Sequence, residues 1–252
     1  MTAVLVFRGE CFRRGDVNTR RRNGGMDDEE LCVTSIWKNV VETWTPHFTK
    51  ACVFVDAFAN DRFAEYESMW KRLKPHNVQL FIRIRKRILP TQKEGVLNTI
   101  KWVNSLVPTY DVMLLTRNNI SFKMRLPVPE YKGRITAPNL FPRDICGGTR
   151  MKSSGKWHDM DRVNDTVLIV CRSRVQDLVD WLERESSADA LADQGMHQLS
   201  DPVYGLKDVF VMWDWKLHAN TSMQANPLYK MVGRPEGTCV QVSCSPGLHR
   251  IS

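Results

Sequence analysis

The sequence predicts an α/β fold, in which a mostly parallel central sheet is flanked by helices. Apolar strand-like runs alternate with amphipathic helical stretches from residue 3 to residue 185, which is the pattern of parallel strands joined by helices. Neither an internal repeat nor a linker rich in Gly, Ser or Pro divides the 252 residues. We therefore expect a single domain over residues 1–235, followed by an irregular tail over residues 236–252.

The first half of the chain contains three expected strands. Each is a short run of apolar, mostly β-branched or aromatic residues, at residues 3–7, 52–56 and 78–82. Between them, Trp37 and Trp44 mark one helical face, and Phe63 and Trp70 mark another, with Pro46 and Pro75 ending these helices. The segment from residue 13 to residue 30 is polar and is expected to be a loop.

The second half continues the alternation and then loses it. A helix is expected around residues 96–107, a strand at 111–116, a further strand at 163–171 and a helix around 175–182. A loop-rich stretch covers residues 127–161. Residues 189–199 are expected to be helical and residues 209–213 to form a last strand. From Thr221 onward the sequence is expected to be irregular.

Net charge, the lengths of apolar runs and the cysteine pattern limit the functions and the location that we expect. Lys and Arg number 36 against 28 Asp and Glu, a formal charge of +8 that favours polyanionic partners. There is no apolar run of about 18 residues, and the opening apolar stretch is too short for a signal-peptide core. We therefore expect a cytoplasmic protein without a membrane span. The seven cysteines include no CxxC pair, which disfavours a disulfide framework or a structural zinc site.

Polar residues follow the expected strands at the positions where open parallel sheets bind ligands. Arginines predominate among them, and guanidinium groups bind phosphate oxygens in a bidentate manner. The set is Arg8, Gly9 and Glu10; Asp56; Arg83 and Arg85; Arg117, Asn118 and Asn119. Neither a P-loop nor a strand-linked GxGxxG motif occurs, so the chain lacks the common nucleotide-binding signatures.

Three short motifs, in a fixed order, carry a family resemblance. Residues 4–13 read VLVFRGECFR, residues 110–120 read YDVMLLTRNNI, and residues 162–165 read RVND before an apolar run. Together they resemble a group of GT-A-like glycosyltransferases of algae and of the large DNA viruses that infect them, the chlorovirus type. The resemblance spans about residues 3–235, with long unmatched stretches between the motifs.

The resemblance implies a Rossmann-like GT-A domain that transfers a sugar from a nucleotide-diphosphate donor to a hydroxyl of a glycan or glycoprotein acceptor in the host cytoplasm. A UDP-sugar is favoured as donor, and UDP-xylose is one such compound. The family usually has Asp where this chain has Asn119. Asn supplies no charge, so a Mn²⁺ or Mg²⁺ site there would be weakened.

The same resemblance suggests roles for individual residues. Asp165 is expected to be the catalytic base or an anchor for a sugar hydroxyl, with capping of the turn before the following strand as the structural alternative. Asp159 and Asp161 form a DxD that could hold a metal together with His197, or could lie in a solvated loop. The residues expected to bind the donor are Arg8, Gly9, Glu10, Arg13, Asp56, Arg83, Arg117, Asn119 and Arg234.

The alternative function is that of a basic nucleic-acid-binding protein without catalytic activity. Such a protein would show a basic helix or exposed aromatic residues interleaved with Lys and Arg. Here the arginines follow strands and the aromatic residues fall on apolar helix faces. This distribution favours the enzyme.

Overall fold

The structure is a computed structural model of the 252-residue chain. It describes residues 1–11, 26–58, 62–75, 77–85, 92–137, 140–141, 162–163, 167–186, 209–213, 216–217, 229–231, 242–243 and 246–250.

An eight-stranded mixed sheet forms the centre of the fold, in the order β14-β10-β6-β9-β4-β1-β2-β3. Its strands are β1 (Thr2–Glu10), β2 (Lys50–Phe58), β3 (Gln79–Arg85), β4 (Val112–Arg117), β6 (Ile135–Ala137), β9 (Val167–Cys171), β10 (Val209–Trp213) and β14 (Pro246–Arg250). The half that contains β3, β2, β1 and β4 is parallel throughout. Strand β9 runs antiparallel to both β4 and β6, and β14 runs antiparallel to β10.

Short strands form three small ribbons beside the main sheet. They are β5 (Ile120–Phe122) with β12 (Tyr229–Met231), β7 (Leu140–Phe141) with β8 (Arg162–Val163), and β11 (Lys216–Leu217) with β13 (Val242–Ser243). All three pairs are antiparallel.

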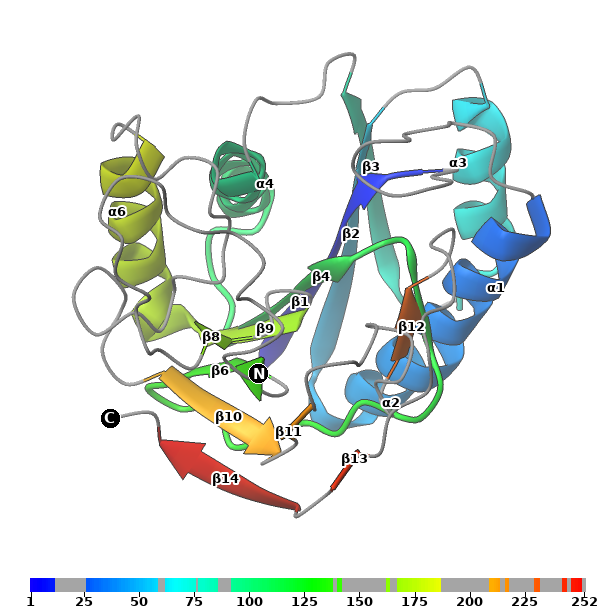
Figure 1. The fold of residues 1–252 in the computed structure, drawn as a ribbon. Coiled ribbons are helices and arrows are strands. Elements are labelled where there is room, and N and C mark those ends of the chain that lie inside the picture. Colours follow the sequence, from blue (N-terminus) through cyan, green and yellow to red (C-terminus); the bar gives the residue numbers. More distant parts are fainter. Residues whose placement is uncertain are drawn as a thin grey trace, which may run out of the picture.

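Helices cover both faces of the sheet, as Figure 1 shows. On one face lie α1 (Met26–Ile36), the π-helical turn η1 (Trp37–Val41), α2 (Glu42–Trp44), the 3₁₀ turn η2 (Thr45–His47) and α3 (Phe63–Arg72). On the other lie α4 (Gln92–Leu106) and α6 (Val175–Ser186), which follows the 3₁₀ turn η3 (Arg172–Arg174). Each face therefore has a core of its own.

Alternation along β1 divides its side chains between these two cores. Leu5 and Phe7 pack with α1, η1 and α3, whereas Val4 and Val6 pack with α4 and α6. Strand β1 is buried on both faces because it lies in the middle of the parallel half of the sheet, and this explains its continuous apolar sequence. By the same alternation, Arg8 belongs to the face covered by α4.

The predicted class, α/β with a mostly parallel sheet between helices, is confirmed. Two local predictions were wrong. The polar segment expected to be a loop up to residue 30 is already helical from Met26, where α1 begins. The stretch expected to be irregular after Thr221 contributes β12, β13 and β14, and β14 forms the edge of the main sheet. Pairing with distant strands, which periodicity does not report, stabilises these short segments. The helix predicted at residues 189–199 and the domain end at residue 235 lie outside the described residues.

The described residues contain neither a membrane-spanning helix nor a paired cysteine. No helix in this part of the chain has the length and apolar character needed to cross a bilayer. Cys11, Cys32, Cys52 and Cys171 are all buried free thiols. They pack as small side chains of the two cores, and Cys11 Sγ also donates to the carbonyl of Phe58 at 3.2 Å.

Trp70 is the natural test of the core beneath α3. Its side chain is fully buried, and its ring lies 5.4 Å from the rings of both Phe7 and Trp37. We predict that Trp70→Ala lowers the free energy of unfolding by about 3–5 kcal/mol, because it leaves a large cavity at a three-ring contact. Urea unfolding measures this. Leu106→Ala, at a half-exposed site, should change stability by less than about 1 kcal/mol; equal losses in the two variants would contradict the described packing.

Candidate functional site

Charged residues form a row across the carboxyl end of the four parallel strands. Arg8 of β1 is in register with Asp56 of β2 on one side and with Arg117 of β4 on the other. Asp56 is in turn in register with Arg83 of β3. Each lies two residues beyond an apolar side chain of the core under α4, so the row belongs to that face of the sheet. The ends of four strands thus bring together three of the predicted arginines and the predicted acid.

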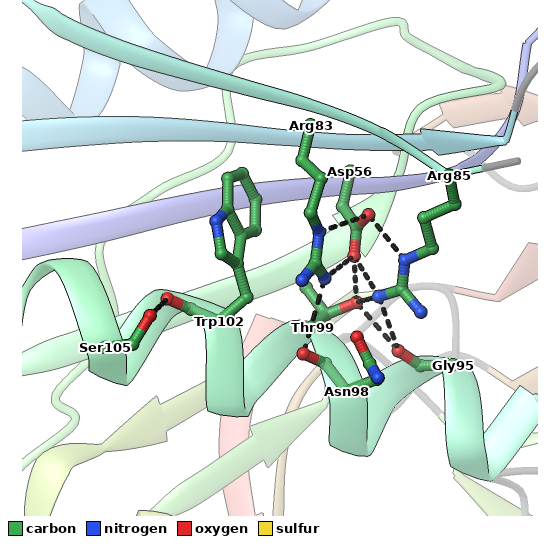
Figure 2. A network of polar contacts seen from close by, with 8 residues as sticks. All are labelled: Asp56, Arg83, Arg85, Gly95, Asn98, Thr99, Trp102 and Ser105. Carbon is green, nitrogen blue, oxygen red and sulfur yellow. Dashed lines mark hydrogen bonds and ion pairs between the residues drawn. The ribbon is translucent and has the colours of Figure 1, made fainter.

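Asp56 is the centre of a dense polar network (Figure 2). Arg83 donates from Nε to Oδ1 at 3.2 Å and from Nη2 to Oδ2 at 2.8 Å. Arg85, two residues further along β3, donates from Nε to Oδ1 at 2.7 Å and from Nη2 to Oδ2. The Oγ1 of Thr99 on α4 lies 2.5 Å from Oδ2. One carboxylate therefore binds two guanidinium groups in bidentate fashion and also reaches the helix above the sheet.

The two arginines attach α4 to the sheet at several points. Arg83 Nη2 donates to the carbonyl of Asn98 at 3.3 Å, and its guanidinium carbon lies 4.3 Å from the ring centroid of Trp102. Arg85 Nη2 lies 3.0 Å from Thr99 Oγ1 and 3.4 Å from the carbonyl oxygen of Gly95. The network therefore sets the position of the first half of α4 over the ends of β2 and β3.

The charge of Asp56 is maintained by its partners. The residue is only 2% exposed, and burial alone would raise the pKa of its carboxyl group. Hydrogen bonds from Arg85, Arg83 and Thr99, together with the charge of Arg85, outweigh burial and hold the pKa below its usual value. Asp56 is thus ionised at neutral pH.

Arg8 reaches the same helix from the neighbouring strand. It is 9% exposed, and its Nη1 lies 3.3 Å from the position that a Cβ would occupy on Gly95. A side chain at position 95 would crowd the guanidinium, so glycine allows Arg8 to lie against the helix. Arg117, at the end of β4, is half-buried. Arg8 and Arg85 therefore converge on Gly95 from two strands.

A close contact ties the end of β1 to the turn after β4. Gly9 has a φ of 137°, and a Cβ there would lie 2.7 Å from Asn118 Oδ1, so both conformation and space require glycine. Asn118 donates from its backbone to the Arg8 carbonyl at 3.0 Å and from Nδ2 to the Gly9 carbonyl at 3.3 Å. Asn119 is 5% exposed, and its Nδ2 finds no hydrogen-bond partner among the described residues.

The turn after β4 does not fit a divalent cation. Its two buried side chains are amides, and Asn118 Nδ2 already donates to Gly9. Among the described residues, the buried amide atoms of this turn left without a partner are one uncharged oxygen, Asn118 Oδ1, and one donor, Asn119 Nδ2. Arg117 precedes them, and Arg8 lies in register beside it. Mg²⁺ and Mn²⁺ prefer carboxylate oxygens, and the described residues contain no cluster of acidic, His or Cys side chains able to hold a metal.

The structure describes some of the predicted site residues and not others. Arg8, Gly9, Asp56, Arg83, Arg117 and Asn119 gather at the carboxyl edge of the parallel strands, and Glu10 is the last residue of β1. The remaining predicted residues lie outside the described part: Arg13, Asp159, Asp161, Asp165, His197 and Arg234.

Sequence reasoning missed Thr99, although it interrupts the apolar stripe of α4 between Val96 and Ile100. A polar residue on a buried helical face was the available signal.

Comparison with known proteins supports the fold. No protein-family model matches this chain, and no curated protein matches it. Among solved structures, it is similar to the nucleoside-diphosphate-sugar pyrophosphorylase from Vibrio cholerae RC9, with a TM-score of 0.51 and 10% sequence identity. The match covers 79% of this chain and 86% of that one. At this identity the likeness shows the fold, and the predicted GT-A-like α/β class agrees with it.

The low pKa of Asp56 leads to a pH-dependent prediction. Its ion pairs stabilise the folded state above the unfolded pKa of about 3.9, and this contribution is lost as the pH falls through the lower pKa of the folded state. Asp56→Asn should therefore cost about 3–5 kcal/mol at pH 7, because it leaves Arg85 buried without its counter-charge. The difference from wild type should shrink below about pH 4.

Urea unfolding at pH 7 and at pH 3 measures this difference. The control is Glu65→Gln, which removes a carboxylate from an exposed pair with Arg62 and should cost less than about 1 kcal/mol at pH 7. A destabilisation by Asp56→Asn that is the same at both pH values would show that the charge of Asp56 is not what matters.

Proposed function

We propose that the protein is a glycosyltransferase that binds a nucleotide-diphosphate sugar at the carboxyl edge of β1, β2 and β4. The observation that carries the proposal is the row in which Arg8 and Arg117 stand side by side at the ends of two parallel strands. Open α/β sheets bind ligands at this edge, and guanidinium groups match the oxygens of a diphosphate. The fold likeness to a nucleoside-diphosphate-sugar pyrophosphorylase supports a nucleotide sugar as the ligand.

The proposed reaction assigns separate roles to cations and to a base. An acceptor hydroxyl of a glycan or glycoprotein attacks the anomeric carbon of the donor, forming the new C–O bond. The bond from that carbon to the diphosphate oxygen breaks, and the nucleoside diphosphate leaves with the electron pair. Asp165, in our assignment, takes the proton of the acceptor hydroxyl. Arg8 and Arg117 offset the negative charge that grows on the leaving diphosphate.

This assignment gives the arginines the role that a divalent cation has in many enzymes handling diphosphates. The turn after β4 carries two buried amides, those of Asn118 and Asn119, and lies beside Arg8 and Arg117, whereas a metal would need carboxylates there. We therefore propose that donor binding depends only weakly on Mn²⁺ or Mg²⁺. Asp159, Asp161 and His197 remain the candidate ligands should a metal bind. A UDP-sugar, for example UDP-xylose, is the proposed donor.

Donor binding tests the proposal. We expect isothermal titration calorimetry to show one UDP-sugar binding more tightly than free uridine, because the diphosphate adds charge-assisted hydrogen bonds to arginine. The affinity should change less than about threefold between EDTA and Mn²⁺, a difference below about 0.7 kcal/mol. Loss of all binding in EDTA would contradict the metal assignment. No binding of any nucleotide sugar would overturn the proposed function, and synthesis of a nucleotide sugar from a nucleoside triphosphate and a sugar 1-phosphate would reassign it to nucleotidyl transfer.

Asp165→Asn tests the base. The substitution keeps the size and most hydrogen bonding of the side chain but cannot accept the proton of the acceptor. Turnover with the preferred donor should fall by roughly 10²–10⁴-fold, while donor affinity stays near that of the wild type. Donor affinity falling in step with rate would make Asp165 a donor ligand instead. A lower melting temperature with unchanged turnover would make it a turn cap.

A further inference from the structure

We propose that the amino-terminal end of α4 holds an oxyanion site, in which Arg85 Nη1 donates to a phosphoryl oxygen beside Gly95. The inference deepens the proposed function, on which it rests for the identity of the ligand. It assigns a phosphoryl group of that ligand to a place between the helix and the end of β3.

The first support is a charged donor without an acceptor. Two of the three guanidinium nitrogens of Arg85 are used: Nε and Nη2 both bind Asp56, and Nη2 also reaches Thr99 and Gly95. The side chain is 10% exposed, and its Nη1 is buried with no hydrogen-bond partner among the described residues. Figure 2 shows this nitrogen pointing away from Asp56, on the side of Gly95. A buried charged donor of this kind costs free energy until an acceptor reaches it.

The second support is an excess of positive charge at the same place. Arg8 approaches Gly95 from β1, and Arg85 approaches it from β3. Asp56 is the carboxylate of the network, Arg83 and Arg85 already share it, and Glu94 is the acidic residue of the first turn. Among these described residues, the three arginines exceed the two carboxylates, those of Asp56 and Glu94, by one positive charge.

The third support is the direction of the helix. The 15-residue α4 begins at Gln92, so the positive end of its dipole lies one turn from Gly95. Because Gly95 lacks a side chain, Arg8 Nη1 lies close to the helix backbone here, and a Cβ on Gly95 would be only 3.3 Å from it. A phosphoryl oxygen at this point would satisfy the free donor of Arg85 and offset the surplus charge. Because Nη1 is shielded from solvent, the bound oxygen would be enclosed, where a charge-assisted hydrogen bond is strong.

Calorimetry with inorganic pyrophosphate tests the site, using Arg85→Lys as the principal variant. Lysine keeps the positive charge beside Asp56 but lacks the second terminal nitrogen that Nη1 provides. We expect pyrophosphate to bind the wild type and to bind Arg85→Lys at least tenfold more weakly. Arg72→Gln is the matched control, since it removes a positive charge from an exposed pair with Glu30 and should change affinity less than twofold. Wild-type affinity in Arg85→Lys would overturn the site.

A second variant keeps the test decisive if Arg85→Lys fails to fold. Gly95→Ala should leave the melting temperature close to that of the wild type, because the greater helix propensity of alanine offsets a close contact with Arg8 Nη1. Its methyl group would lie 3.3 Å from Arg8 Nη1 and crowd the place where we propose that the oxyanion binds. Pyrophosphate affinity should then fall at least fivefold in a stably folded protein, and unchanged affinity would refute the site.

Parallel titrations separate this inference from the proposed function. Inorganic phosphate, pyrophosphate, UDP and the preferred UDP-sugar are compared on the wild type and on Arg85→Lys. Weaker binding of UDP and of the UDP-sugar, with uridine unaffected, supports the site and identifies its ligand as the donor. A UDP-sugar that binds both proteins equally refutes the site and leaves the proposed function standing. Pyrophosphate binding that depends on Arg85, without any nucleotide-sugar binding, supports the site and refutes the proposed function.

Discussion

The interaction on which the rest of this structure depends is the sharing of one buried carboxylate, that of Asp56, between two arginines of the neighbouring strand. A carboxylate this deeply buried is stable only when its charge is matched and its oxygens are hydrogen-bonded. Arg83 and Arg85 meet both needs, and Thr99 extends the network to α4. The arrangement ties the edge strand β3 to β2 and to the helix. It also leaves the network one positive charge in excess, which is the basis of our proposal that this edge binds an anion.

Fold and candidate site therefore use the same residues. Parallel strands in register place their last residues at one level, so residues far apart in sequence become a single charged row. Gly9 lets the side chain of Asn118 lie close to the end of β1, and Gly95 lets Arg8 lie close to α4. The amides that follow β4 stand where a cation would need acids. This arrangement supports our proposal that arginine side chains bind a polyanion at this edge.

Much of the parallel half of the fold could be predicted because its signals are local. The apolar run of β1 and the helical stripe of α4 report burial directly, and register then brings Arg8, Asp56, Arg83 and Arg117 together. The pairing of β14 with β10 could not be predicted from the sequence in the same way, since it depends on a strand more than 30 residues away. Nor does sequence show that Asp56 is already occupied by Arg83 and Arg85. The choice between a free carboxylate and an ion pair is made by side-chain geometry, and only the structure reports it.

The most direct test of the central claim is a crystal structure of the protein with a bound nucleotide-diphosphate sugar or its nucleoside diphosphate. The account predicts that the diphosphate lies over the carboxyl ends of β1 and β4, with its oxygens in contact with arginine and without an ion held by Asn118 or Asn119. A diphosphate bound at another edge of the sheet, or a metal ion coordinated at the turn after β4, would contradict it.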